Sequence, residues 1–138
     1  MNTDQMTQVV VPVRYPLSEH SRATLAQAIE ITEERDGQLT VIHVNQYQDN
    51  HQATRRDLKD AVEREFGRLP NTRYVVRKGL LVEETLLDEI VAEDADVVVI
   101  GKKQAGRWRR MIRRLVDDPD IETFLRDELD CDVVTAEH

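Results

Sequence analysis

The run Val97-Val98-Val99-Ile100 constrains the fold of this chain most, because four consecutive β-branched residues that end at Gly101 are typical of a strand buried on both faces. Residues 8–13 and 39–44 form similar short apolar runs. Each run is followed by apolar residues at helical spacing. Alternation of buried strands with helices predicts an α/β protein with a doubly wound parallel sheet and helices on both faces, since the crossovers are right-handed.

The pattern predicts five strands, at residues 8–13, 39–44, 72–78, 97–100 and 131–136, with helices between them. The third strand is more polar and is expected at an edge of the sheet. Gly37 should end the first helix in the left-handed conformation, and Gly67 should end the second. Between the last two strands we expect two helical pieces, the second beginning at Asp118-Pro119. Residues 1–138 are expected to form one domain.

The positive charge of the chain is concentrated in one block. The chain has 19 Lys and Arg against 27 Asp and Glu, for a net charge of −8. Seven of the basic residues and no acid lie between 102 and 114, directly after the strand that ends at Gly101. Such asymmetry indicates an interaction surface. Abundant carboxylates with few lysines are also typical of a high-salt cytoplasm, although an ordinary acidic protein has the same pattern.

The sequence also indicates the cellular compartment of the protein. The single Cys131 excludes an intrachain disulfide, which favours a reducing compartment. No apolar run approaches the ~20 residues that span a bilayer. Residues 1–7 are polar and lack the apolar core of a signal peptide. We therefore expect a soluble cytoplasmic protein without membrane insertion.

Single residues that suggest chemistry have simpler interpretations. His43 lies inside a strand and is expected to be packed and hydrogen-bonded. The four histidines are too dispersed to predict a metal site. Cys131 is expected to be inert. Trp108 has helical spacing with Met111, which favours an inward-facing indole over a base-stacking group. No catalytic constellation is recognisable, so we predict no enzyme activity.

The order of motifs resembles the universal stress protein family over nearly the whole chain. The matching pieces are Val11-Pro12-Val13, the loop from Ser18 to Ser21, Val41-Ile42-His43-Val44, Val76-Arg77-Lys78-Gly79 with Glu83-Glu84, and Ala95-Asp96-Val97-Val98-Val99-Ile100-Gly101. The resemblance implies the adenine nucleotide alpha hydrolase-like fold with strand order 3-2-1-4-5. It also implies a homodimer through the last strand, Asp132 to Ala136.

Many members of this family bind ATP through Gly-x2-Gly-x9-Gly-Ser/Thr after the fourth strand, and this chain departs from that motif. Gly101 matches the first glycine, but Gln104 occupies the second position unless Gly106 substitutes for it. Asp118-Pro119 stands where Gly-Ser is expected, and Arg14 replaces the usual acidic residue after the first strand. ATP and AMP are therefore only candidate cofactors.

These departures suggest that side-chain cations replace backbone donors in an anion site. The alternative is a filled crevice in which Arg14 pairs with Asp118 or another acid. The residues expected to form the site are Pro12, Val13, Arg14, Val44, Gly101, Lys102, Lys103, Gly106 and Arg107.

The sequence leaves three functions open. The first is a small stress-associated regulatory or binding protein with a modified or vestigial nucleotide site, which acts by association and not turnover. The second is an ATP-binding protein with slow hydrolysis. The third is an interaction module that docks an acidic protein partner or nucleic acid through the segment from Arg107 to Arg114. The acidic net charge makes nucleic acid the less favoured partner.

Overall fold

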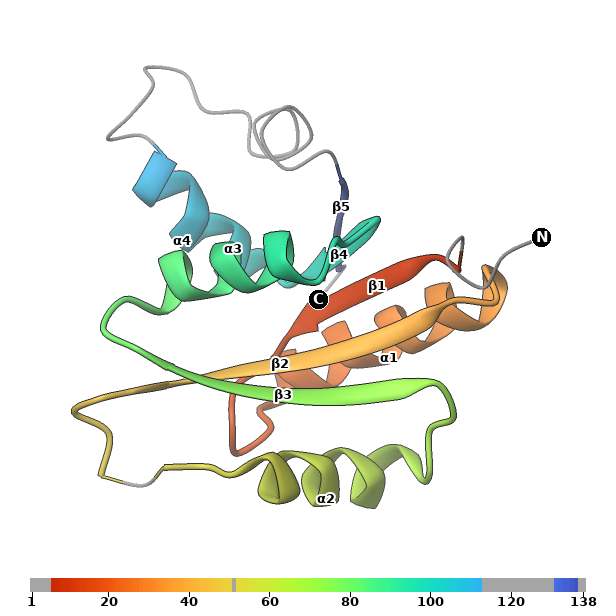
Figure 1. The fold of residues 1–138 in the computed structure, drawn as a ribbon, viewed down its shortest axis with the longest axis horizontal. Helices are drawn as coiled ribbons and strands as arrows, with labels where there is room; N and C mark the ends of the chain where they lie inside the picture. Colours follow the sequence, from red (N-terminus) through yellow and green to blue (C-terminus); the bar gives the residue numbers. More distant parts are fainter. Residues whose placement is uncertain (1–5, 51, 113–130, 137–138) are drawn as a thin grey trace.

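The computed structural model describes residues 6–50, 52–112 and 131–136. The strands within these ranges form one five-stranded parallel sheet (Figure 1). The strand order is β3-β2-β1-β4-β5, as the family resemblance implies. The strands are β1 (Gln8–Pro12), β2 (Gln38–Gln46), β3 (Thr72–Gly79), β4 (Val97–Ile100) and β5 (Asp132–Thr135). The polar β3 lies at an edge, as its sequence predicts.

Helices cover both faces of this sheet. Helices α1 (Glu19–Glu34) and α2 (Arg55–Phe66) lie on one face, and α3 (Val82–Ala92) and α4 (Lys102–Ile112) lie on the other (Figure 1). The predicted helix start at Asp118-Pro119 and the helix after it fall outside the described residues. No helix in the described ranges is long and apolar enough to span a membrane.

The side-chain alternation of β1 divides the core between the two faces. Val9 and Val11 pack with Leu25 of α1 and Leu58 of α2, whereas Val10 belongs to the cluster that contains Trp108 of α4. All of these side chains are completely buried. This central parallel strand therefore contributes apolar residues to both faces, which explains its continuous run of valines.

Helix ends follow the sequence with one correction. Ser18 caps α1, and Thr54 and Asp57 form a reciprocal capping box at the start of α2. The prediction for Gly37 is wrong, because Asp36 takes the left-handed conformation with φ of 49°. A Cβ on Gly37 would lie 2.6 Å from the backbone oxygen of Thr7, so this glycine serves the close approach of two chain segments.

Two further details differ from the expected pattern. Strand β2 continues through Asn45 and Gln46, beyond the predicted strand at residues 39–44. Asn45 is tolerated inside because its amide bonds the backbone of Ala53 twice, accepting from the N–H at 3.1 Å and donating to the carbonyl at 2.8 Å. Val91, expected on the buried stripe of α3, is 60% exposed.

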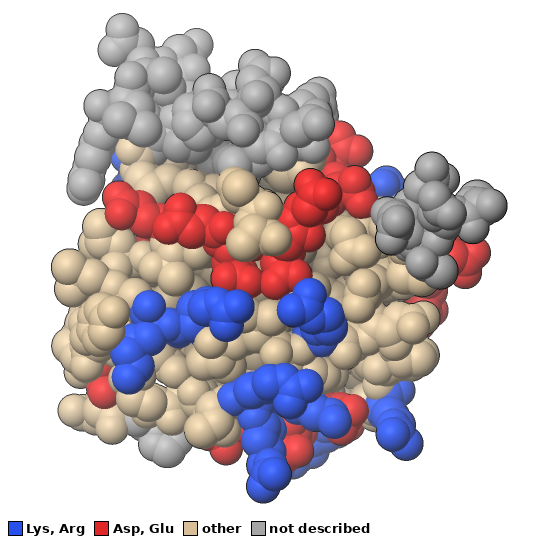
Figure 2. Space-filling view, in the orientation of Figure 1, with Lys and Arg blue, Asp and Glu red and all other residues tan. Residues whose placement is uncertain are grey.

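An acidic band over α3 borders a basic band along β3 (Figure 2). Two ion pairs join the bands. Arg73 lies 2.7 Å from Glu93, and Arg77 lies 2.8 Å from Glu89. Both carboxylates are largely buried, so α3 is fixed to the edge strand by charge-assisted hydrogen bonds as well as by apolar packing.

Candidate functional site

A pocket of about 540 Å³ opens at the carboxyl ends of β1, β2 and β4. Its walls come from the loop after β1, the first turns of α1, the end of β2, and the starts of α3 and α4. This is the edge where open α/β sheets bind ligands, because the loops of neighbouring strands diverge there. The volume is within the range of small-molecule sites.

Eight of the nine residues expected to form the site line this pocket. They are Pro12, Val13, Arg14, Val44, Gly101, Lys102, Lys103 and Arg107. Gly106 is not among the lining residues, and a Cβ placed on it would lie nearest to Arg110, at 3.8 Å. Gln104 lines the pocket instead.

Helix α4 begins at Lys102, immediately after Gly101. The backbone N–H of Ala105 donates to the carbonyl of Gly101 at 3.0 Å. The N–H groups of residues 102–104 precede this first helical bond and lie at the positive end of the helix. The buried Nε2 atom of Gln104 has no hydrogen-bond partner among the described residues. A start of this kind provides donors for a negatively charged group.

Gly101, directly after β4, lies close to Thr24 of α1. A Cβ at this position would lie 3.0 Å from the hydroxyl oxygen of Thr24. The tight approach explains a glycine at the end of the strand without any need for positive φ.

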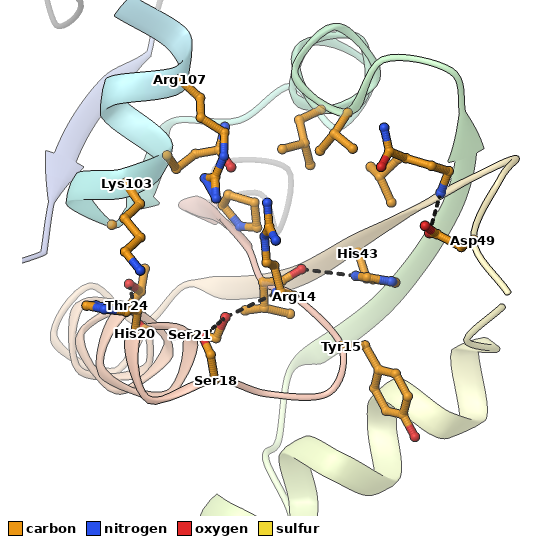
Figure 3. A pocket seen from close by; sticks show the side chains of 18 of the residues that line it. Arg14, Tyr15, Ser18, His20, Ser21, Thr24, His43, Asp49, Lys103 and Arg107 are labelled. Atoms are coloured by element: carbon orange, nitrogen blue, oxygen red, sulfur yellow. Dashed lines mark hydrogen bonds between the residues drawn. The ribbon is translucent and has the colours of Figure 1, made fainter. Parts of the chain in front are cut away.

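Two arginines reach into the pocket from different elements. Arg14 extends from the loop after β1 and Arg107 from α4, and their guanidinium groups turn toward one another (Figure 3). The pKa of Arg107 is lowered, first by burial and then by the positive charge of Arg14, while Glu83 opposes the shift. Lys103 extends from α4 toward Thr24 (Figure 3). Positive charge from separate segments is thus gathered at one place.

Arg14 has no carboxylate within 4.0 Å among the described residues, and the sequence alternative in which it pairs with Asp118 lies outside them. Its backbone N–H donates to the Ser21 hydroxyl oxygen at 3.1 Å. That hydroxyl also accepts from Ser18 at 3.2 Å. The loop that carries Arg14 is therefore anchored to the first turn of α1.

The hydroxyl-bearing wall was not predicted. Ser18, Ser21 and Thr24 all face the pocket from the start of α1. Their spacing of three residues places them on one helix face, whereas the sequence analysis uses the segment from Ser18 to Ser21 only for the family resemblance. They add neutral hydrogen-bonding groups beside the cations.

The far side of the pocket is less basic. His43 is buried, as predicted, with Nδ1 3.2 Å from the carbonyl oxygen of Val13 and Nε2 3.1 Å from Oδ1 of Asn45. The Tyr15 ring meets the His43 ring edge-on, with centroids 6.2 Å apart. Asp49 also lines this side and accepts from the backbone N–H of Gln46 at 2.8 Å. The pocket therefore has a cationic end and a mixed aromatic and polar end.

Trp108 faces the core, as its helical spacing predicts. The indole is completely buried, while Arg109 and Arg110 on the same helix are exposed. A buried indole cannot stack on a nucleic-acid base. Arg113 and Arg114 lie outside the described residues. Among the described residues no group of three or more His, Cys, Asp or Glu side chains is arranged to hold a metal ion.

Comparison with known proteins identifies the family of this chain. The chain matches the model of the universal stress protein family over residues 6–118, and it belongs to that family. A search of curated protein sequences found no match.

Solved structures agree on the fold. Universal stress protein UspA from Lactobacillus plantarum is 19% identical, with a TM-score of 0.63 over 95% of this chain and 97% of that one. A family protein from Burkholderia pseudomallei is 18% identical, with a TM-score of 0.65 over 99% and 100%. The universal stress protein from Archaeoglobus fulgidus in complex with dAMP is 17% identical, with a TM-score of 0.53 over 96% and 98%.

Proposed function

We propose that this protein is a regulatory binding protein that holds an anionic, nucleotide-class ligand in the pocket at the carboxyl edge of its sheet. It acts by association and not by turnover. The observation that carries the proposal is the convergence of Arg14, Lys102, Lys103 and Arg107 on one open pocket. The complex of the Archaeoglobus fulgidus relative with dAMP supports the nucleotide class.

The lining of the pocket suits a ligand with a negatively charged end and an aromatic end. Cations and the first N–H groups of α4 suit a phosphate, whereas Tyr15, His43 and Val44 offer aromatic and apolar surface for a base. Asp49, the acidic group among the described lining residues, already accepts a backbone hydrogen bond.

A homodimer through β5 is part of the proposal. β5 is the outer strand beside β4, so one side of its backbone faces away from the sheet. A second copy pairing along that side would cover an edge that otherwise invites nonspecific association.

Isothermal titration and thermal unfolding with AMP and ATP test the binding function. A ligand at a hundredfold excess over Kd should stabilise the protein by about 2.7 kcal/mol. The double variant Lys102→Gln/Lys103→Gln should weaken binding, because both lysines line the pocket.

The matched control is Lys78→Gln/Arg109→Gln, which removes the same charge from exposed sites outside the pocket. Equal weakening by the two double variants would attribute binding to net charge alone. No stabilisation by either nucleotide at millimolar concentration would refute the proposal. Release of phosphate from ATP over many turnovers would replace association with hydrolysis.

A further inference from the structure

Arg14 and Arg107 share one pocket but have little negative charge between them. Among the described residues, the contact of the Arg107 guanidinium with a carboxylate is long, since Nε lies 3.9 Å from Oε1 of Glu83 on α3. Both of those side chains are only 24% exposed. Arg14 has no carboxylate within 4.0 Å in the described part of the chain. Two guanidinium charges are thus offset by one distant carboxylate.

The two charges repel one another across the pocket. Burial and the charge of Arg14 both lower the pKa of Arg107, and Arg110 acts in the same direction. An anion between the guanidinium groups would reverse this repulsion. Each guanidinium offers a planar fork of donors that matches two oxygens of one phosphate.

We propose that Arg14 and Arg107 form a clamp for a phosphate monoester dianion, and that Glu83 is the internal counter-charge that occupies Arg107 when the clamp is empty. This inference rests on the proposed function and names the ligand group that the pocket selects. A dianion with three terminal oxygens can bond both forks and neutralise both charges. A phosphodiester has two free oxygens and one charge, so it leaves part of the repulsion in place.

Glu83 adds a regulatory element to the clamp. It lies at the start of α3, and Arg107 lies on α4, so their contact links the two helices that cover this face of the sheet. A ligand phosphate must compete with the Glu83 carboxylate for Arg107. Neutralising Glu83 should therefore increase ligand affinity, which is opposite to the effect of removing an ordinary binding residue.

Isothermal titration with AMP, cAMP, ribose 5-phosphate and inorganic phosphate at pH 7.5 tests the clamp. Phosphate monoesters are largely dianionic at this pH, with a second pKa of about 6, whereas cAMP is a monoanion. We expect AMP to bind at least about tenfold more tightly than cAMP, because a charge-assisted hydrogen bond is lost with the diester. Lowering the pH from 7.5 to 5 should weaken AMP binding relative to cAMP binding, since charge changes of the lining His20 and His43 act on both ligands.

Variants assign this selectivity to named residues. Arg14→Gln and Arg107→Gln should each reduce the preference for AMP over cAMP by about tenfold or more. Glu83→Gln should raise AMP affinity several-fold. Glu84→Gln is the matched control, because it removes the same charge from the next residue of α3 without contact to Arg107. Arg14 is exposed, so its replacement leaves the core intact and keeps the test open if Arg107→Gln fails to fold.

The outcomes separate the clamp from the proposed function. Equal affinity for AMP and cAMP, or equal effects of Glu83→Gln and Glu84→Gln, would overturn the clamp while binding itself stands. No binding of any of the four compounds, or of ATP, would overturn both. If ribose 5-phosphate or inorganic phosphate binds as tightly as AMP, the clamp is supported and the nucleobase contributes no affinity. A clear advantage for AMP supports the clamp and identifies a nucleoside monophosphate as the source of the phosphate.

Discussion

Replacement of Tyr74 by phenylalanine should stabilise the protein, because the structure leaves its hydroxyl group buried and unpaired. The Tyr74 side chain on β3 is 4% exposed, and its hydroxyl oxygen has no hydrogen-bond partner among the described residues. A buried hydroxyl without a partner loses its bonds to water and gains none in return. Tyr74→Phe should therefore raise the free energy of unfolding by about 1 kcal/mol at neutral pH.

The same hydroxyl predicts a loss of stability in alkali. Burial, and then the negative charge of Glu63, raise the pKa of Tyr74 to about 12, while Arg55 opposes the shift. Below pH 10 the tyrosine is protonated in both folded and unfolded chains, so it contributes no pH dependence. Between pH 10 and 12 the unfolded chain loses the proton and the folded chain keeps it. Stability from this group must therefore fall as pH rises through that window.

The magnitude follows from the two pKa values. At pH 11 a pKa of 10 in the unfolded chain and about 12 in the folded chain corresponds to about 1.4 kcal/mol, and screening of the Glu63 and Arg55 charges reduces it to about 1 kcal/mol. Tyr74→Phe removes this component. The variant should thus exceed the parent protein by about 1 kcal/mol at pH 8 and by about 2 kcal/mol at pH 11.

Urea unfolding at the two pH values measures both effects. Tyr47→Phe is the matched control, since Tyr47 is 63% exposed and its replacement should change neither value by more than a few tenths of a kcal/mol. The reasoning fails if Tyr74→Phe destabilises the protein at pH 8, or if its advantage over the parent does not grow between pH 8 and pH 11.

Two further predictions concern the capping box and the outer strand. Thr54→Ala should lower the free energy of unfolding by about 1 kcal/mol, because the Thr54 hydroxyl accepts from the Asp57 N–H at 3.1 Å. Thr54→Ser keeps a hydroxyl and should retain most of that stability. Thermal unfolding that does not distinguish the two variants would contradict the capping role. Thr135→Pro should convert the proposed homodimer to monomer in light scattering. The N–H groups of Asp132 and Ala136 donate to the carbonyls of Asp96 and Ile100, on the side of β5 that faces β4. Because N–H groups alternate in direction along a strand, the N–H of residue 135 points to the outer side. Thr135→Val, which keeps that N–H, should remain dimeric, and an unchanged mass for Thr135→Pro would exclude β5 as the interface.

Local patterns predicted the strands because the central ones are buried on both faces. Val97–Ile100 is buried at all four positions, so the sequence signal is a simple apolar run. The strand order came from the family resemblance, since no local pattern specifies which parallel strands are neighbours. Asn45 shows the limit of periodicity. A buried polar residue can be assigned to a strand only when its hydrogen-bond partner, here the Ala53 backbone, is known.

The basic half of the candidate site could be located from sequence, because Gly101 and the cations after it adjoin a predicted strand end. The hydroxyl wall of α1 could not be assigned, since capping already explains Ser18 and nothing local distinguishes a helix face that meets a pocket. The opposition of Arg14 and Arg107 was also beyond sequence reasoning. Those residues are 93 positions apart, and their approach depends on the parallel crossovers that bring the ends of β1 and β4 together.

The unequal treatment of arginines within this one molecule is the strongest argument for a ligand. Arg73 and Arg77 on β3 each have a carboxylate of their own within 2.8 Å. Among the described residues, Arg14 and Arg107 have only Glu83 within 4.0 Å, and its carboxylate lies 3.9 Å from Arg107. Exposed arginines such as Arg35 and Arg109 also have no carboxylate within 4.0 Å in the described part of the chain, but Arg107 is only 24% exposed and shares a pocket with Arg14. Uncompensated like charges destabilise a folded protein unless something else neutralises them, and an anion that enters the pocket would do so.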